Sequence, residues 1–159
     1  MKFHVVAVGH RMPEWIDAGF GEYAKRMPRD ARLVLTEIRP ASRGGAAGAS
    51  AIERALQTEH ERIVAALPAG CYRVVLDERG KSLSTRELAD SIGHWRGVGR
   101  DVAFIIGGAD GTSGALKREA DMLWSLSPLT LPHALVRVVL AEQLYRAMSI
   151  LNRHPYHRE

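Results

Sequence analysis

The sequence contains a single cysteine, Cys71, and no apolar run long enough to cross a membrane. One thiol forms neither an internal disulfide nor a cysteine zinc cluster, so we interpret Cys71 as a small packing residue in a reducing cytoplasm. The apolar stretch 102–106 is far shorter than the roughly 20 residues of a membrane-spanning helix. The amino-terminal apolar run ends too soon for a secretory signal. We therefore expect a cytoplasmic protein without a membrane span.

The spacing of metal ligands is also absent. Seven histidines are scattered along the chain, so we predict no metal site.

The net charge is +4, and arginine outnumbers lysine. This balance suits an anionic partner such as nucleic acid, but an arginine-rich genome composition explains it equally well.

The composition is that of an ordinary globular protein. The chain has 159 residues, of which 46% are hydrophobic and 25% are charged, so disorder and coiled-coil repeats are disfavoured. A chain of this length supports one hydrophobic core. We predict a single domain over residues 1–159.

Strand and helix patterns alternate along the chain. Strands are expected at 3–8, 33–38, 72–77, 102–106 and 122–126. Helices are expected where apolar residues recur at helical spacing after Pro13, after capping boxes at Ser50 with Glu53 and at Ser84 with Glu87, over 117–120, and from Pro132 to about 152. This order predicts an α/β domain with a mostly parallel sheet flanked by helices, with strand 102–106 at its centre.

Ligands of such sheets bind at the carboxyl ends of the strands, where three loops stand out. Gly80-Lys81-Ser82 imitates the end of a phosphate-binding loop, but Val75 occupies the position of its first glycine, so Lys81 is interpreted as part of a surface turn. In the loop 107–114, glycines expose backbone to a ligand and Asp110 opposes a pyrophosphate, which favours a cationic or uncharged ligand; simple turn formation is the alternative.

The third loop, 126–133, holds two prolines, Pro128 and Pro132, together with apolar residues and two hydroxyls. It is either an apolar wall for an adenine ring or an ordinary connector. The final helix after it is apolar around most of its circumference, so we expect it to be wholly internal or shared with a second subunit.

The chain ends in cations, imidazoles and a phenol over residues 152–159. Such a tail is either a frayed terminus or an acceptor site in which an aromatic ring stacks on a base, a cation holds a phosphate and histidine moves a proton.

Together these segments resemble one family over nearly the whole chain. The loops 106–111 and 126–133, the helix segments 135–138 and 142–147, the tail 152–159 and the start Val6-Ala7-Val8-Gly9 with Met12, Pro13 and Trp15 are similar to bacterial 23S ribosomal RNA pseudouridine N3-methyltransferases of the SPOUT class. The resemblance implies an α/β fold with a deep carboxyl-terminal trefoil knot, a homodimer, and methylation of a stem-loop within the assembled ribosome. The alanine- and glycine-rich loop 39–49 departs from the more lysine-rich loop of relatives.

The same resemblance implies S-adenosylmethionine as the cofactor. Its expected contacts are Leu76, Gly107, Gly108, Leu126, Ser127, Pro128, Leu129, Thr130, Leu131 and Pro132. On the acceptor side we expect His157 as a base, Arg153 and Arg158 on a phosphate or carbonyl oxygen, and Tyr156 for stacking, while His133 is interpreted as structural. The alternatives are a non-catalytic ribosome-binding or assembly factor and a knotted transfer RNA methyltransferase.

Overall fold

The computed structural model describes residues 1–45 and 48–158. Ala46 and Ala47 of the loop 39–49, and Glu159 at the end of the tail, lie outside the described residues. Among the described residues, no helix is both long and apolar enough to cross a membrane.

Five strands form one sheet in which every neighbouring pair is parallel. They lie in the order β2-β1-β4-β3-β5, so β4 is central and the prediction for 102–106 is confirmed. All five residues of β4 are buried, as expected for a strand covered on both faces. The strands are β1 (Phe3–Val8), β2 (Leu33–Ile38), β3 (Tyr72–Ser82), β4 (Val102–Ile106) and β5 (Met122–Ser125).

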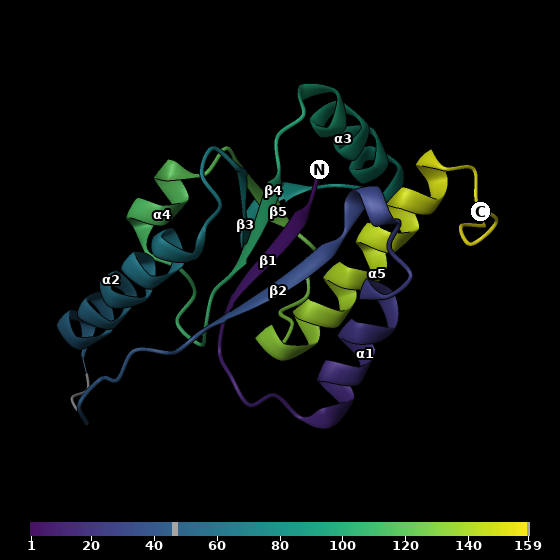
Figure 1. The fold of residues 1–159 in the computed structure, drawn as a ribbon. Helices are drawn as coiled ribbons and strands as arrows, with labels where there is room; N and C mark the ends of the chain where they lie inside the picture. The colour runs from purple at the N-terminus through teal and green to yellow at the C-terminus, as the bar shows by residue number, and fades with distance from the viewer. Residues whose placement is uncertain (46–47, 159) are drawn as a thin grey trace.

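Helices cover both faces of the sheet, which confirms the predicted α/β class. On one face lie α1 (Glu14–Ala24), α3 (Thr85–Val98) and α5 (His133–Leu151), and on the other α2 (Ala49–Ala66) and α4 (Gly114–Glu119) (Figure 1). Each face has its own cluster of buried apolar residues, and Phe104 and Ile105 of β4 point into opposite clusters. A short 3-10 turn, Arg29–Ala31, precedes β2.

The first residue of a helix is set by a side-chain cap at α3 but not at α2. At α3 the predicted capping box is confirmed, because the Ser84 hydroxyl accepts from the Glu87 amide while the Glu87 carboxylate accepts from the Ser84 amide. At α2 the prediction is wrong, because Gly48 is the N-cap and Ser50 lies inside the first turn. Gly48 has φ of 122°, a conformation that favours glycine, and the chain enters the helix two residues earlier than the Ser50 hydroxyl would require.

For α5 the sequence leaves two alternatives open, and the structure shows how much of the helix this chain covers by itself. Helices α1 and α3 both pack against α5, and Leu140, Leu144 and Met148 are completely or almost completely buried in the core of this chain. Within the described residues, the large exposed hydrophobic side chains lie elsewhere; they are Trp15, Val34, Val64, Val98 and Leu129. Leu135, Val138 and Val139 are only half-buried, so this chain covers most but not all of the apolar circumference of α5.

Strand β3 is longer than predicted and changes register. Leu76 and Lys81 both pair with Trp124 of β5, so residues 77–80 bulge out of the ladder before pairing resumes. Gly80 allows this close approach, because a Cβ there would lie 2.6 Å from backbone atoms of Leu123 and Trp124. The glycine that imitates a phosphate-binding loop thus serves strand packing.

Candidate cofactor-binding site

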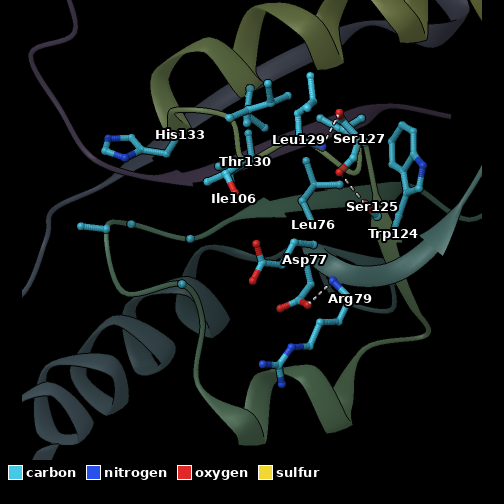
Figure 2. Close-up of a pocket in the computed structure, with 18 of the residues that line it drawn as sticks. Leu76, Asp77, Arg79, Ile106, Trp124, Ser125, Ser127, Leu129, Thr130 and His133 are labelled. Carbon is cyan, nitrogen blue, oxygen red and sulfur yellow. Dashed lines mark hydrogen bonds between the residues drawn. The ribbon is translucent and has the colours of Figure 1, made fainter.

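A cavity of about 550 Å³ opens at the carboxyl ends of β3, β4 and β5 (Figure 2). Its volume lies within the range of small-molecule sites. The structure brings most of the sequence-predicted cofactor residues together in its wall. These are Leu76, Gly107, Gly108, Leu126, Ser127, Leu129, Thr130 and Leu131, whereas the predicted residues Pro128 and Pro132 are not among its lining residues.

The glycine turn after β4 forms one wall. Gly108 and Gly111 form an isolated bridge in which the Gly111 amide donates to the Gly108 carbonyl at 3.0 Å. A Cβ at Gly107 would lie 2.5 Å from the Gly111 carbonyl oxygen and 2.9 Å from Thr112 Cγ2. The turn is therefore closed on itself so tightly that residue 107 has no room for a side chain, and its backbone faces the cavity.

The loop between β5 and α5 forms the opposite wall. The Ser125 hydroxyl donates to the Ser127 carbonyl at 3.0 Å, and the Leu129 amide donates to the Ser127 hydroxyl at 2.9 Å (Figure 2). These bonds fix the loop with Leu129 73% exposed at the cavity mouth. The loop thus combines an ordered backbone with an apolar rim, as an adenine-sized ring requires.

Charged residues missed by the sequence analysis line the floor of the cavity. The bulge of β3 places Asp77, Glu78 and Arg79 there, and Lys117 of α4 contacts the Asp77 carboxylate at 2.6 Å. Burial opposes ionisation of Asp77, but the Lys117 ammonium and the Arg79 amide outweigh it and lower the pKa of Asp77. Asp77 is therefore ionised at neutral pH, and its charge is paired with that of Lys117. These residues reach the cavity because the pairing of β3 with β5 changes register, and the sequence carries no clear sign of that change.

His133 and Arg137 connect α5 to the ends of β1 and β2. Arg137 is fully buried, and its guanidinium donates to Glu37 Oε2 at 2.8 Å and to the Gly9 carbonyl at 3.0 Å. His133, one turn earlier, lines the cavity and lies next to Gly9. This ion pair fixes the start of α5, and with it the rim of the cavity.

We expect Glu37→Ala to lower the free energy of unfolding by about 3 kcal/mol, because it leaves the Arg137 charge buried without its carboxylate. Urea denaturation measures the change. Glu53→Ala, at an exposed position of α2, is the matched control and should change stability by less than about 0.5 kcal/mol. Equal effects of the two substitutions would show that the buried pair does not hold the fold.

The predicted acceptor residues of the tail lie far from this cavity. Helix α5 begins at the cavity with His133 and has 19 residues, so about 28 Å of helix separate the cavity from the tail (Figure 1). Among the described residues the cavity lining includes none of Arg153, Tyr156, His157 or Arg158. Within one chain, the residues predicted to bind the cofactor and those predicted to bind the acceptor form two separate groups.

The tail is held against its own helix. Tyr156 donates to Glu142 Oε1 at 3.1 Å, packs against Tyr145 with ring centroids 4.6 Å apart, and lies under the Arg146 guanidinium at 4.7 Å. Burial, hydrogen bonding to Tyr23 and the charge of Glu142 raise the pKa of Tyr156 to about 12. The phenol thus stays protonated at neutral pH. His157 Nδ1 is buried, and no hydrogen-bond partner is found for it in the described part of the chain.

Among the described residues, no group of three or more His, Cys, Asp or Glu side chains is arranged to hold a metal ion.

The fold and the position of the cavity define an α/β protein with a ligand site at the carboxyl edge of its sheet. The family described as "Predicted SPOUT methyltransferase" matches residues 1–157, and the chain belongs to this family. Relatives named Ribosomal RNA large subunit methyltransferase H include one from Laribacter hongkongensis, 54% identical over 159 residues and 100% of both chains. Another, from Ralstonia nicotianae, is 58% identical over 158 residues and 99% of both chains.

Solved structures agree at the level of the fold. A probable methylase family protein from Haemophilus influenzae superposes with a TM-score of 0.52 at 14% identity, covering 99% of this chain and 70% of that one. A structure described in connection with 2-OH methylation of C/U34 on tRNA gives 0.52 at 17% identity, covering 93% and 97%. The architecture is thus one that other methylases share.

Proposed function

We propose that this chain is an S-adenosylmethionine-dependent methyltransferase of large-subunit ribosomal RNA, with residues 1–159 as one catalytic domain. The observation that carries the proposal is the cavity at the carboxyl edge, in a chain more than half identical over its whole length to proteins named for this activity. The acceptor we propose is N3 of a pseudouridine in 23S ribosomal RNA within the assembled ribosome.

The cavity residues suit S-adenosylmethionine. The ligand has no phosphate, and the cavity offers no phosphate cradle: its glycine turn is closed by the Gly108–Gly111 bridge and flanked by Asp110. The ordered loop 126–131 provides backbone groups and an apolar rim for the adenine ring. We assign binding to these two loops and to Leu76, with Pro128 and Pro132 stiffening the second loop from outside the cavity.

When bound, S-adenosylmethionine supplies a methyl group on a positively charged sulfur. The chain contributes alignment of the acceptor nitrogen and removal of the N3 proton. We assign the removal of the N3 proton to His157. We assign the contacts with phosphate or carbonyl oxygens to Arg153 and Arg158. Tyr156 contacts Tyr145 and Arg146 with its ring, so its proposed role becomes anchoring of the tail on α5.

In a homodimer, the proposed acceptor residues of one chain can lie next to the proposed cofactor residues of the other. Helices that follow parallel strands begin at the carboxyl edge of the sheet, so the starts of α1 and α5 lie there together. Trp15 is 62% exposed at the start of α1, and Leu129 is 73% exposed just before α5. We propose that a second copy covers these side chains and brings its own tail to the cavity, and that the chain forms the trefoil knot of its class near the cofactor loops.

We expect the purified protein to transfer a labelled methyl group from S-adenosylmethionine to assembled ribosomes, and to transfer far less to free large subunits or to transfer RNA. Mapping the label by nuclease digestion and mass spectrometry identifies the modified base. Binding to ribosomes without transfer would favour an assembly factor, and transfer mainly to transfer RNA would move the acceptor to another class of RNA.

A further inference from the structure

A second, smaller cavity of about 180 Å³ adjoins the cofactor cavity. It lies between the loop after β2 and the glycine turn after β4, and it extends to α2. The two cavities share Gly108, Ala109, Asp110 and His133 in their walls. Its volume is below that of a typical ligand site, so it suits one flat ring and excludes a whole nucleotide.

A buried carboxylate lines this second cavity. Glu59 lies on the face of α2 that also buries Ala55 and Ile63, and it is only 9% exposed. Its Oε1 atom accepts from the Ala41 amide at 3.1 Å. Within the described residues no partner is found for Oε2. Oε2 is not among the fully buried side-chain atoms without a partner, so it is open to the cavity. A ligand that fills the cavity displaces water from this oxygen and must donate a hydrogen bond to it in exchange.

The glycine turn places this oxygen next to the cofactor site. A Cβ built on Gly108 would lie 3.1 Å from Val8 Cγ1 and 4.0 Å from Glu59 Oε2. Gly108 thus stands between the Glu59 carboxylate and the larger cavity, whose wall its backbone also forms. A ring in the second cavity would have one edge at Glu59 and a neighbouring edge at the cofactor cavity.

We propose that Glu59 selects pseudouridine over uridine by accepting the N1–H of the acceptor base in the second cavity. This inference rests on the proposed function. In uridine, N1 is bonded to ribose and carries no hydrogen, whereas pseudouridine is joined to ribose through C5 and keeps an N1–H. N1 and N3 flank C2 on the side of the ring opposite C5. A ring that enters with this side first brings N1 to Glu59 and N3 to the cofactor cavity.

Glu59 alone has the required combination of burial and a free acceptor in this cavity, judged over the residues that the structure describes. Asp110 also lines the cavity, but its carboxylate pairs with Arg43 and is 30% exposed, so water and a cation already satisfy it. A ligand that fills the cavity without a donor would desolvate the Glu59 oxygen and leave it unpaired, so the site discriminates against such a ligand.

The test is Glu59→Gln, assayed on ribosomes with pseudouridine at the target position and on ribosomes from cells lacking the enzyme that makes it. The carbonyl oxygen of the substituted side chain should keep the Ala41 bond, which turns its NH2 group toward N1–H so that two donors meet. We expect the ratio of kcat/KM for pseudouridine over uridine to fall at least about tenfold, with S-adenosylmethionine affinity within about twofold of wild type. Glu61→Gln, on the exposed side of the same helix, is the control and should keep the wild-type ratio.

Each other outcome has a definite meaning. An unchanged ratio in Glu59→Gln overturns the inference, and so does a wild-type protein that methylates both kinds of ribosome equally. Loss of activity on both, with normal cofactor affinity by calorimetry, would make Glu59 generally required and would also overturn a role in selection. Failure of the wild-type protein to methylate any ribosome instead refutes the proposed function.

Discussion

Gly107→Ala is expected to weaken S-adenosylmethionine binding at least about tenfold while the chain stays folded. The added Cβ would lie 2.5 Å from the Gly111 carbonyl oxygen and 2.6 Å from its carbon, and backbone atoms cannot yield as a flexible side chain can. The turn 107–111 must therefore shift, and that turn forms a wall of the cofactor cavity. Isothermal titration calorimetry measures the affinity, and circular dichroism checks the fold.

Gly97→Ala is the matched control. Gly97 lies in α3, and a Cβ there meets no atom within 4 Å. It should leave cofactor affinity unchanged and raise stability by up to about 1 kcal/mol, the usual difference between alanine and glycine in a helix. A folded Gly107→Ala protein with wild-type affinity would show that the glycine turn does not bind the cofactor. Gly108→Val is a less direct test, because its side chain would point toward Val8 and Glu59.

Deleting residues 154–159 is expected to abolish methylation of ribosomes, by more than about a hundredfold, with little change in cofactor affinity. The tail and the cofactor cavity lie at opposite ends of α5, so removing one leaves the other intact. Filter binding of labelled methyl groups on ribosomes and calorimetry with S-adenosylmethionine measure the two effects separately. If the shortened protein methylates ribosomes normally, the tail is a terminus without a role in the site.

The same deletion also tests whether the site is shared between two copies. Mixing the shortened chain with the Gly107→Ala chain, after co-expression, gives heterodimers in which one intact cavity meets one intact tail. With random pairing, activity should recover to about one quarter of the wild-type value. No recovery, although a light-scattering mass of two chains shows that dimers form, would place tail and cavity in the same subunit.

The arrangement of strands could be read from the sequence because each strand carries its own signal. The buried run of β4 and the Ser84 capping box at α3 are local features, and both were predicted correctly. The coverage of α5 could not be judged, because it depends on how α1 and α3 pack on that helix. Trp15 shows the same limit: it follows the helical apolar pattern of α1, yet 62% of it is exposed.

Site residues marked by local sequence signals could likewise be predicted, whereas those that depend on tertiary packing could not. The glycine turn and the loop 126–131 were recognised because glycine and proline mark loops directly in the sequence. Asp77 and Lys117 were missed, since they meet only through the register change of β3 and the docking of α4. Glu59 was missed because it lies within a regular helical pattern, and nothing in that pattern reveals which carboxylate the fold buries.

The repeated pairing of Trp124 with Leu76 and Lys81 has a consequence for how the protein folds. Strand β5 has only four residues, at the edge of the sheet, so its docking depends on the part of β3 that leaves the ladder and returns. Strands β1, β2 and β4 can pair before β5 docks on β3. The loop between β5 and α5 can adopt its final position only after β5 has docked. We therefore expect the cofactor pocket to mature late in folding, and amide hydrogens of residues 122–131 to exchange with solvent sooner than those of β4.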